Sequence, residues 1–234
     1  MPHPPSPAKA ATPKSFDEAY FRRFYFDPRT RVTTPAEMRA KARMIAAVLD
    51  RCELPVRSVL DAGCGVGTLR AGFAKRWPAA VYTGLERSEY LCARYGWIQG
   101  SVEDFAPDCR YDLVVCYDVL QYLDDRAAAK ALANLTRLAR VAIYLSALTV
   151  ADWHEHCDQR LTDGDVHLRP ADWYRRRLAR QFRFIGCGVW VRRGIEAYQW
   201  ELERPAPPVT RVRESSRRAP DAGVRRHRSR PAGR

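Results

Sequence analysis

Three glycines at alternate positions follow an apolar segment in the stretch SVLDAGCGVGTLRAGF, residues 58–73. The apolar segment predicts a strand that ends near Asp61, and the residues from Thr68 onward predict a helix. A glycine loop between a strand and a helix lets a ligand approach the backbone closely, and the first N–H groups of the helix face that ligand. The spacing therefore predicts a ligand-binding loop that contains Gly63, Gly65 and Gly67.

The glycine loop does not match the two common phosphate-binding motifs. A dinucleotide-binding G-x-G-x-x-G loop requires a third glycine where this chain has Thr68, and a Walker loop requires G-K-[ST], which is absent. A second feature is Glu86, at the end of the next predicted strand and nineteen positions after Gly67. A carboxylate there can accept both hydroxyl hydrogens of a ribose, so a ribose-containing ligand is expected. An NAD-dependent oxidoreductase is a remaining alternative, and it has to explain the missing glycine.

Short apolar segments and helical patterns alternate along residues 56–149, which predicts a parallel α/β sheet. Before them, Thr34 predicts the N-cap of an amphipathic helix. After them, residues 169–182 predict a helix that begins near a proline. Two strand-like segments, FRFIGCGVWVRR (182–193) and EAYQWELE (196–203), then predict an antiparallel hairpin at the edge of the sheet.

Four segments in this order resemble the motifs of the class I S-adenosylmethionine-dependent methyltransferases. They are LDAGCGVG (60–67), the acidic Glu86, GSVEDF (100–105) and YDLVVCYDVLQYL (111–123), and the resemblance covers about residues 56–204. Later segments resemble a bacterial subgroup of the family. The resemblance implies a doubly wound α/β fold with a mostly parallel, seven-stranded, Rossmann-like sheet, an antiparallel last strand and an N-terminal helical cap over the cofactor.

The resemblance also implies a binding site for S-adenosylmethionine. Asp61 and the glycine loop would surround the methionine part, Glu86 would bind the ribose, and Ser101 would lie beside the adenine. Many relatives have an aspartate where this chain has Ser101, so Glu103 or Asp104 is expected to contact the adenine amino group. The predicted cofactor site comprises Asp61, Gly63, Cys64, Gly65, Gly67, Glu86, Arg87, Ser101, Val102, Glu103 and Asp118.

Methyl transfer from a sulfonium depends mostly on in-line positioning and exclusion of water, because the leaving group is neutral. A hydroxyl or a protonated amine as acceptor would also need a base. Candidates lie in the loop after the fifth predicted strand, although they can equally cap the next helix or pair with arginines. Three histidines and Cys157 in this region match no usual zinc spacing, so no metal is predicted. The candidate catalytic residues are His154, Glu155, His156 and Asp158.

The net charge of +13 is concentrated at the C-terminal end of the chain. Residues 205–234 contain nine arginines against Glu214 and Asp221, and they hold almost no large apolar side chains. Such a segment cannot offset its ordering entropy, so we expect a disordered basic tail, a disordered head at residues 1–15 and one methyltransferase domain at residues 16–204. A small molecule is the expected methyl acceptor. The alternative is a noncatalytic S-adenosylmethionine-binding module whose tail binds RNA or an anionic partner.

Cysteine usage and hydropathy predict a cytoplasmic location. The seven cysteines are scattered without a C-x-x-C pair, as expected for reduced thiols, and the longest apolar segment is too short to cross a bilayer. Aromatic residues in YFRRFYF (20–26) offer a lid over the cofactor, or they pack the first helix against the domain.

Overall fold

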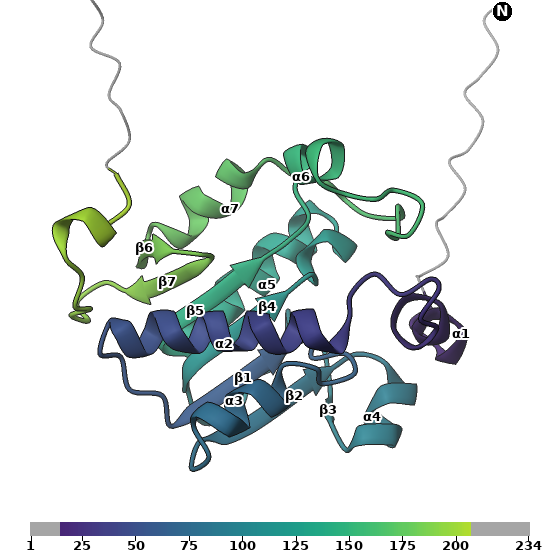
Figure 1. The fold of residues 1–234 in the computed structure, drawn as a ribbon, viewed down its shortest axis with the longest axis horizontal. Helices are drawn as coiled ribbons and strands as arrows, with labels where there is room; N and C mark the ends of the chain where they lie inside the picture. The colour runs from purple at the N-terminus through teal and green to yellow at the C-terminus, as the bar shows by residue number, and fades with distance from the viewer. Residues whose placement is uncertain (1–14, 207–234) are drawn as a thin grey trace, which may run out of the picture.

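Seven strands form one sheet in the part of the chain that this computed structural model describes, residues 15–206 (Figure 1). The strand order is β3-β2-β1-β4-β5-β7-β6. Neighbours from β3 to β5 are parallel, and β7 is antiparallel to both of its neighbours. The strands are β1 (Ser58–Ala62), β2 (Val81–Glu86), β3 (Ile98–Gln99), β4 (Tyr111–Tyr117), β5 (Ala139–Ser146), β6 (Phe182–Gly186) and β7 (Val189–Arg192).

The strand order reverses direction between β1 and β4. Open α/β sheets bind ligands at this point, in the crevice at the carboxyl ends of the strands. The mostly parallel sheet with its antiparallel last strand confirms the fold class predicted from the sequence.

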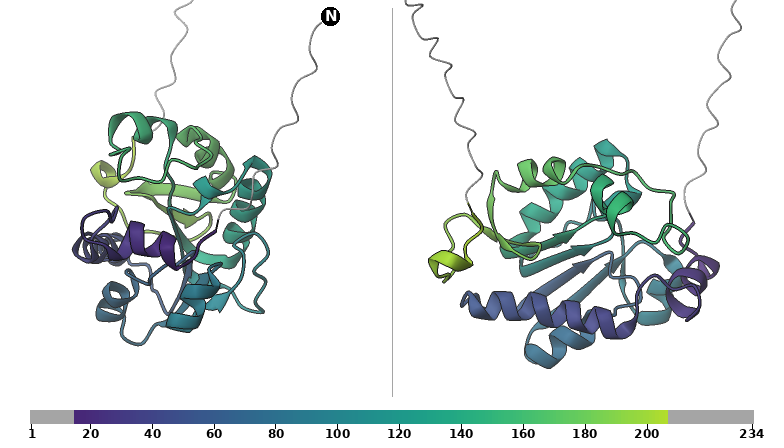
Figure 2. Two further views of the ribbon diagram at one scale, coloured as in Figure 1. Left: turned by 90° about the vertical axis from the view of Figure 1, so that its right-hand side faces the viewer. Right: turned by 45° about the horizontal axis from the view of Figure 1, so that its top comes forward.

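Helices cover both faces of the sheet (Figure 2). In the described residues they are α1 (Glu18–Phe21), a π-helix (Arg22–Phe26), α2 (Pro35–Arg51), α3 (Arg70–Arg76), α4 (Glu89–Tyr95), a 3-10 helix (Leu120–Tyr122), α5 (Asp125–Leu138), α6 (Val150–Glu155), α7 (Ala171–Leu178) and a second 3-10 helix (Glu201–Glu203). Leu113 and Val115 of β4 pack with α2 and α3, whereas Val114 and Cys116 pack with α5 and α7. All four side chains are buried, as expected for a strand covered on both faces.

The predicted start of α2 is confirmed. The Thr34 hydroxyl accepts a hydrogen bond from the Glu37 N–H at 3.2 Å, and the Glu37 carboxylate accepts one from the Thr34 N–H at 2.7 Å. This reciprocal capping box, with Pro35 at the first helical position, satisfies donors that a helix end leaves unpaired.

The predicted hairpin was placed too far along the chain. Both of its strands lie within residues 182–193, and residues 196–203 form no strand. The turn consists of Cys187 and Gly188, with φ of 47° and 77°, and two residues at positive φ are what a tight turn between antiparallel strands requires. The prediction was wrong because this turn divides a segment that was taken as one strand.

The helix predicted over residues 169–182 is shorter than expected. Pro170 is its N-cap and α7 ends at Leu178, because Phe182 already begins β6. No helix among residues 15–206 is long and apolar enough to span a membrane. The predicted head and tail lie outside the described residues, apart from residues 15, 205 and 206, so the domain limits stay a prediction.

Candidate active site

The glycine loop leaves the carboxyl end of β1 and is fixed from two sides. The Gly65 N–H donates to Oε2 of Glu86 at 2.8 Å, and Nε1 of Trp97 donates to the Gly65 carbonyl at 2.9 Å. Gly65 has φ of +54°, and a Cβ at this position would meet no atom within 4 Å. The loop therefore presents open space at Gly65, in a backbone conformation that favours glycine.

Glu86 ends β2 and is buried against the loop. Its carboxylate accepts hydrogen bonds from the N–H groups of Gly65, Arg87 and Ser88 at 2.8, 2.8 and 2.9 Å. A carboxylate offers about four acceptor positions, so one remains for a ligand. Glu86 consequently orders the loop and can also bind a hydroxyl group directly.

Asp61, at the end of β1, is buried beneath the loop with 2% of its surface exposed. It accepts a hydrogen bond from the Tyr82 hydroxyl at 2.5 Å. Burial raises the pKa of Asp61 to about 7, although the bond from Tyr82 acts in the opposite direction. The side chain can therefore change its charge near neutral pH, when a cation approaches it.

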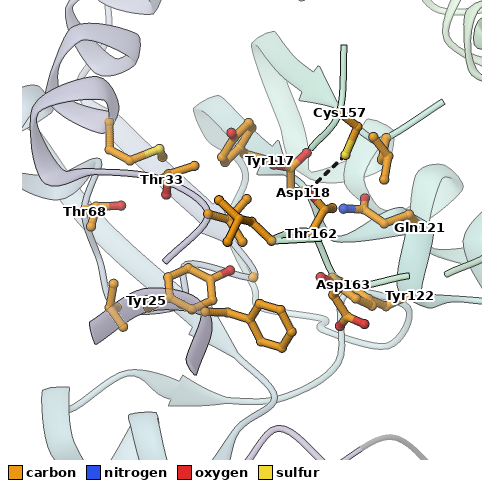
Figure 3. Close-up of a pocket in the computed structure, with 18 of the residues that line it drawn as sticks. Tyr25, Thr33, Thr68, Tyr117, Asp118, Gln121, Tyr122, Cys157, Thr162 and Asp163 are labelled. Atoms are coloured by element: carbon orange, nitrogen blue, oxygen red, sulfur yellow. Dashed lines mark hydrogen bonds between the residues drawn. The ribbon is translucent and has the colours of Figure 1, made fainter. Parts of the chain in front are cut away.

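Two cavities meet at the carboxyl edge of the sheet. The larger has a volume of about 350 Å³ and contains Asp61, Thr68 and part of the segment between β5 and α7 in its walls, as Figure 3 shows in part. The smaller, of about 100 Å³, is lined by Glu86 and its neighbours. The two cavities adjoin along a shared wall of lining residues, so one ligand can extend from one cavity into the other. This wall consists of Tyr20, Tyr25, Gly63, Gly65, Tyr117, Asp118 and Tyr122.

The predicted cofactor residues divide between these cavities, with one exception. Asp61 and Cys64 line the larger cavity, whereas five residues line only the smaller, and Gly63, Gly65 and Asp118 line both. Gly67 lines neither, because it packs against Trp97, whose ring atom would lie 2.5 Å from an added Cβ. The five residues of the smaller cavity are Glu86, Arg87, Ser101, Val102 and Glu103.

Aromatic residues from the N-terminal segment close the site. Tyr20 and Tyr122 share a hydrogen bond between their hydroxyl groups at 3.0 Å, and Phe16 meets the Tyr122 ring edge-on at 5.4 Å. Ser88 donates to the Phe16 carbonyl at 2.5 Å. Tyr20, Tyr25 and Phe21 line the cavities and Phe21 is buried, so the segment YFRRFYF packs against the domain beside the site; its role as a lid over the cofactor stays a prediction.

The four candidate catalytic residues lie at the end of α6 and just after it. All four residues are exposed; His156 and Asp158 line the larger cavity, whereas His154 and Glu155 lie outside its lining. Hydrogen bonds from Arg160 hold the pKa of Asp158 below its usual value. Among residues 15–206, no group of three or more His, Cys, Asp or Glu side chains is arranged to hold a metal ion.

The sequence interpretation missed Asp163. Asp163 lines the larger cavity because the segment after α6 folds back over the sheet, and no local periodicity indicates that fold. Gln121 follows β4, is 4% exposed, and its Oε1 has no hydrogen-bond partner among the described residues. In Figure 3, Tyr25, Thr33 and Thr68 face Gln121, Tyr122, Thr162 and Asp163 across the cavity.

Arg169 holds the 3-10 helix Leu120–Tyr122 in place. It is 3% exposed, and its guanidinium donates to the carbonyls of Leu120 and Leu123 at 3.0 and 2.5 Å and to Asp125 at 2.7 Å. The Gln121 carbonyl also accepts the His167 N–H at 2.7 Å. These bonds connect the segment after α6 to the end of β4, so they position Gln121 and Tyr122.

Arg169→Leu is expected to lower the free energy of unfolding by about 2 kcal/mol, because two carbonyls lose their donor in a buried place. Urea denaturation followed by circular dichroism measures this change. Arg175→Leu is the matched control, since Arg175 makes an exposed ion pair with Asp172 at 3.2 Å and should cost less than about 0.5 kcal/mol. Equal midpoints for the two variants would contradict the structural role of Arg169.

Comparison with known proteins gives the family. Residues 59–141 match the family model described as a methyltransferase domain. This part of the chain is a methyltransferase domain. This confirms the resemblance seen in the sequence motifs, and the match begins at β1 and ends inside β5.

Solved structures share the fold of this methyltransferase domain. Magnesium protoporphyrin IX methyltransferase from Synechocystis PCC 6803 has 20% identity and a TM-score of 0.56, over 74% of this chain and 93% of that one. The sugar N-methyltransferase KedS8 from Streptoalloteichus has 18% identity and a TM-score of 0.54, over 82% of this chain and 97% of that one. At these identities the similarity shows the fold alone.

A curated relative is more similar in sequence but matches over a shorter region. Trans-aconitate 2-methyltransferase of Deinococcus radiodurans is 31% identical over 130 residues, which is 52% of this chain and 48% of that enzyme. The methyltransferase domain therefore spans about half the length of this relative.

Proposed function

We propose that the chain binds S-adenosylmethionine across the two cavities and transfers its methyl group to a small-molecule acceptor. The observation that carries this proposal is Gly65, which lines both cavities and leaves open the space where a side chain would stand. The Synechocystis enzyme was solved with S-adenosylmethionine and with S-adenosylhomocysteine, which supports the choice of cofactor.

The residues present fit this cofactor. Glu86 has an acceptor position left for the ribose, and Ser101 and Glu103, which hydrogen-bond each other, lie in the smaller cavity where the adenine would bind. Asp61 is available for the ammonium group of the methionine part. When bound, the cofactor supplies an electrophilic methyl carbon on a sulfonium ion.

The protein would position the two reactants, exclude water and provide a general base. The half-buried aromatic side chains Tyr20, Tyr25 and Tyr122 belong to the shared wall of the cavities and would limit the access of water to a bound cofactor, which favours direct displacement. We infer that His156 accepts the acceptor's proton, because it lines the larger cavity and an imidazole nitrogen can act as a general base. Asp158 is the second candidate, and its bonds to Arg160 make it a weaker base.

The noncatalytic alternative depends on the basic tail, which lies outside the described residues. The relatives named above are methyltransferases whose names specify small molecules, and no comparison supports a nucleic-acid partner. The tail therefore stays a separate question from the chemistry of the cavities.

Isothermal titration with S-adenosylmethionine, S-adenosylhomocysteine and NAD tests the proposed function. We expect saturable binding of the first two at one site and no binding of NAD. Binding of NAD without S-adenosylhomocysteine would instead support the oxidoreductase alternative. If none of the three binds, the match to the methyltransferase family model would reflect shared ancestry and not the proposed function.

Binding of S-adenosylhomocysteine is expected to weaken as pH falls through about 7. Asp61 has a raised pKa of about 7, so it takes up a proton below this pH and no longer attracts the ligand's ammonium group. Between pH 7.5 and 5.5 the affinity should fall on the order of tenfold. Titrations over this range measure the effect, and the matched variant Asp61→Asn should bind weakly without this pH dependence. A wild-type affinity that stays constant would remove Asp61 from the ligand contacts.

A further inference from the structure

The larger cavity is rich in carboxylates and has no lysine or arginine among the described residues that line it. All of these carboxylates have contacts within the chain, and those of Asp118 include the side chains of Tyr117 and Gln121. Asp61 belongs to the proposed cofactor site, Asp152 accepts hydrogen bonds from Thr149 in the cap of α6, and Asp158 pairs with Arg160. The complete set is Asp61, Asp118, Asp152, Asp158 and Asp163.

Asp118 and Asp163 bring carboxyl groups to this cavity from two different elements, and both are labelled in Figure 3; burial raises the pKa of Asp118. Asp118 belongs to the wall shared with the smaller cavity, and Asp163 belongs to the segment that folds over the sheet. Asp118 has φ of +54°, a conformation that few non-glycine residues adopt and that aspartate tolerates better than most. The strand end thus places a carboxylate at the junction where a methyl group would be transferred.

Aromatic rings complete a lining that favours cations. Tyr20, Phe24, Tyr25, Tyr117 and Tyr122 all face the larger cavity. An ammonium group is attracted to the face of an aromatic ring, more strongly where water is excluded. The protein itself shows this contact, because Nζ of Lys41 lies 4.1 Å from the centre of the Tyr117 ring. Lys41 also partly offsets the charge of Asp118, but its side chain is not part of the lining.

Gln121 supplies an independent observation. It lines the same cavity, is 4% exposed, and its Oε1 has no donor among the described residues. A buried acceptor without a donor costs free energy until a ligand provides one. An ammonium group provides up to three N–H donors, whereas a carboxylate provides none.

We propose that the methyl acceptor is a small amine, which the larger cavity binds as its ammonium ion between Asp118, Asp163 and Gln121. This proposal rests on the proposed function and names its substrate class. The bound ammonium loses one proton to His156, and the nitrogen lone pair forms a bond to the methyl carbon. The carbon–sulfur bond breaks, its electron pair stays on sulfur as a neutral thioether, and the product is an N-methylammonium ion.

The movement of positive charge during methyl transfer favours an amine acceptor. Positive charge leaves the sulfur and develops on the nitrogen, so a carboxylate beside the nitrogen stabilises the transition state more than the ground state. A carboxylate acceptor would find no lysine or arginine in the described lining.

A hydroxyl acceptor would have to ionise in an unfavourable place. Burial and the charges of Asp163 and Asp118 raise the pKa of Tyr122 to about 12, and the pKa of Tyr25 is raised for the same reasons. An acceptor hydroxyl in this cavity would meet the same resistance to ionisation. A bound ammonium ion also has to lose a proton, but it then becomes a neutral amine, whereas a hydroxyl would become an anion beside the carboxylates of the lining.

Three probes of equal skeleton test the proposal: 2-phenylethylammonium, 2-phenylethanol and 3-phenylpropionate. Each is titrated into the full chain by calorimetry, with and without saturating S-adenosylhomocysteine. The ammonium is expected to bind at least about tenfold more tightly than the other two. Carboxylate or alcohol binding as tight as that of the ammonium, or no detectable ammonium binding, would overturn the proposal. Failure of S-adenosylhomocysteine to bind counts only against the proposed function, because the preference among the probes is measured without it as well.

Matched variants identify the groups that recognise the ammonium. Asp118→Asn and Asp163→Asn should each weaken ammonium binding about tenfold and leave alcohol binding unchanged, since asparagine keeps the shape and tolerates positive φ. Asp108→Asn makes the same change of charge at an exposed site outside the cavity lining and should change neither. Equal ammonium affinity in all three variants would overturn the proposed contacts. Circular dichroism establishes that each variant is folded.

Discussion

Gly65→Val is expected to lower the affinity for S-adenosylhomocysteine by at least about 100-fold while the sheet stays intact. Gly65 lies at φ of +54°, which a β-branched residue adopts only with strain. Its missing side chain leaves space in the wall shared by the two cavities, where a valine would project. The loop would therefore change its shape, and the valine side chain would occupy part of the space that the ligand needs.

Gly194→Val is the matched control for this loss of affinity. Gly194 also has a positive φ, of 87°, and a Cβ there would also meet no atom within 4 Å. Because it lies outside the lining of both cavities, this variant should carry similar backbone strain without loss of affinity. Calorimetry on both variants, with circular dichroism as a measure of folding, separates occlusion from strain. Wild-type affinity in a folded Gly65→Val variant would mean that the ligand does not approach the loop.

The sequence was sufficient to predict the glycine loop, Glu86 and the parallel sheet, because each is encoded by short-range patterns. Gly65 and Glu86 are twenty-one positions apart in the sequence. Gly65 follows the end of β1, and Glu86 is the last residue of β2. Parallel pairing of β1 with β2 then brings the two carboxyl ends together. The site at the strand ends follows from local signals combined with one rule of topology.

The acceptor side of the site could not be predicted in the same way. Asp163 reaches the larger cavity because Arg169 and the Gln121 carbonyl fasten the segment after α6 to the end of β4. These bonds join residues more than forty positions apart and leave no periodic pattern in the sequence. The hairpin was misplaced for a different reason, because a two-residue turn at Cys187 and Gly188 resembles a glycine inside a strand.

Glu86→Ala is expected to weaken S-adenosylhomocysteine binding by about 2 to 3 kcal/mol, through two separate losses. The ribose loses a charge-assisted hydrogen bond, and three N–H groups, on Gly65, Arg87 and Ser88, lose the acceptor that orders them. Glu89→Ala, at an exposed position in the first turn of α4, is the matched control and should bind within about twofold of the wild type. Unchanged affinity in folded Glu86→Ala would place the ribose elsewhere.

A comparison of two nucleosides separates the direct contact from the ordering of the loop. If Glu86 binds the ribose, the wild type should prefer adenosine over 2′,3′-dideoxyadenosine by about 1 to 3 kcal/mol. Glu86→Gln keeps the size of the side chain but places an amide where the carboxylate accepts the Gly65 N–H, so it disturbs the loop for both ligands equally. The preference for adenosine should therefore disappear in Glu86→Gln if the contact is direct. It should persist, at lower affinity for both nucleosides, if Glu86 acts only by positioning Gly65.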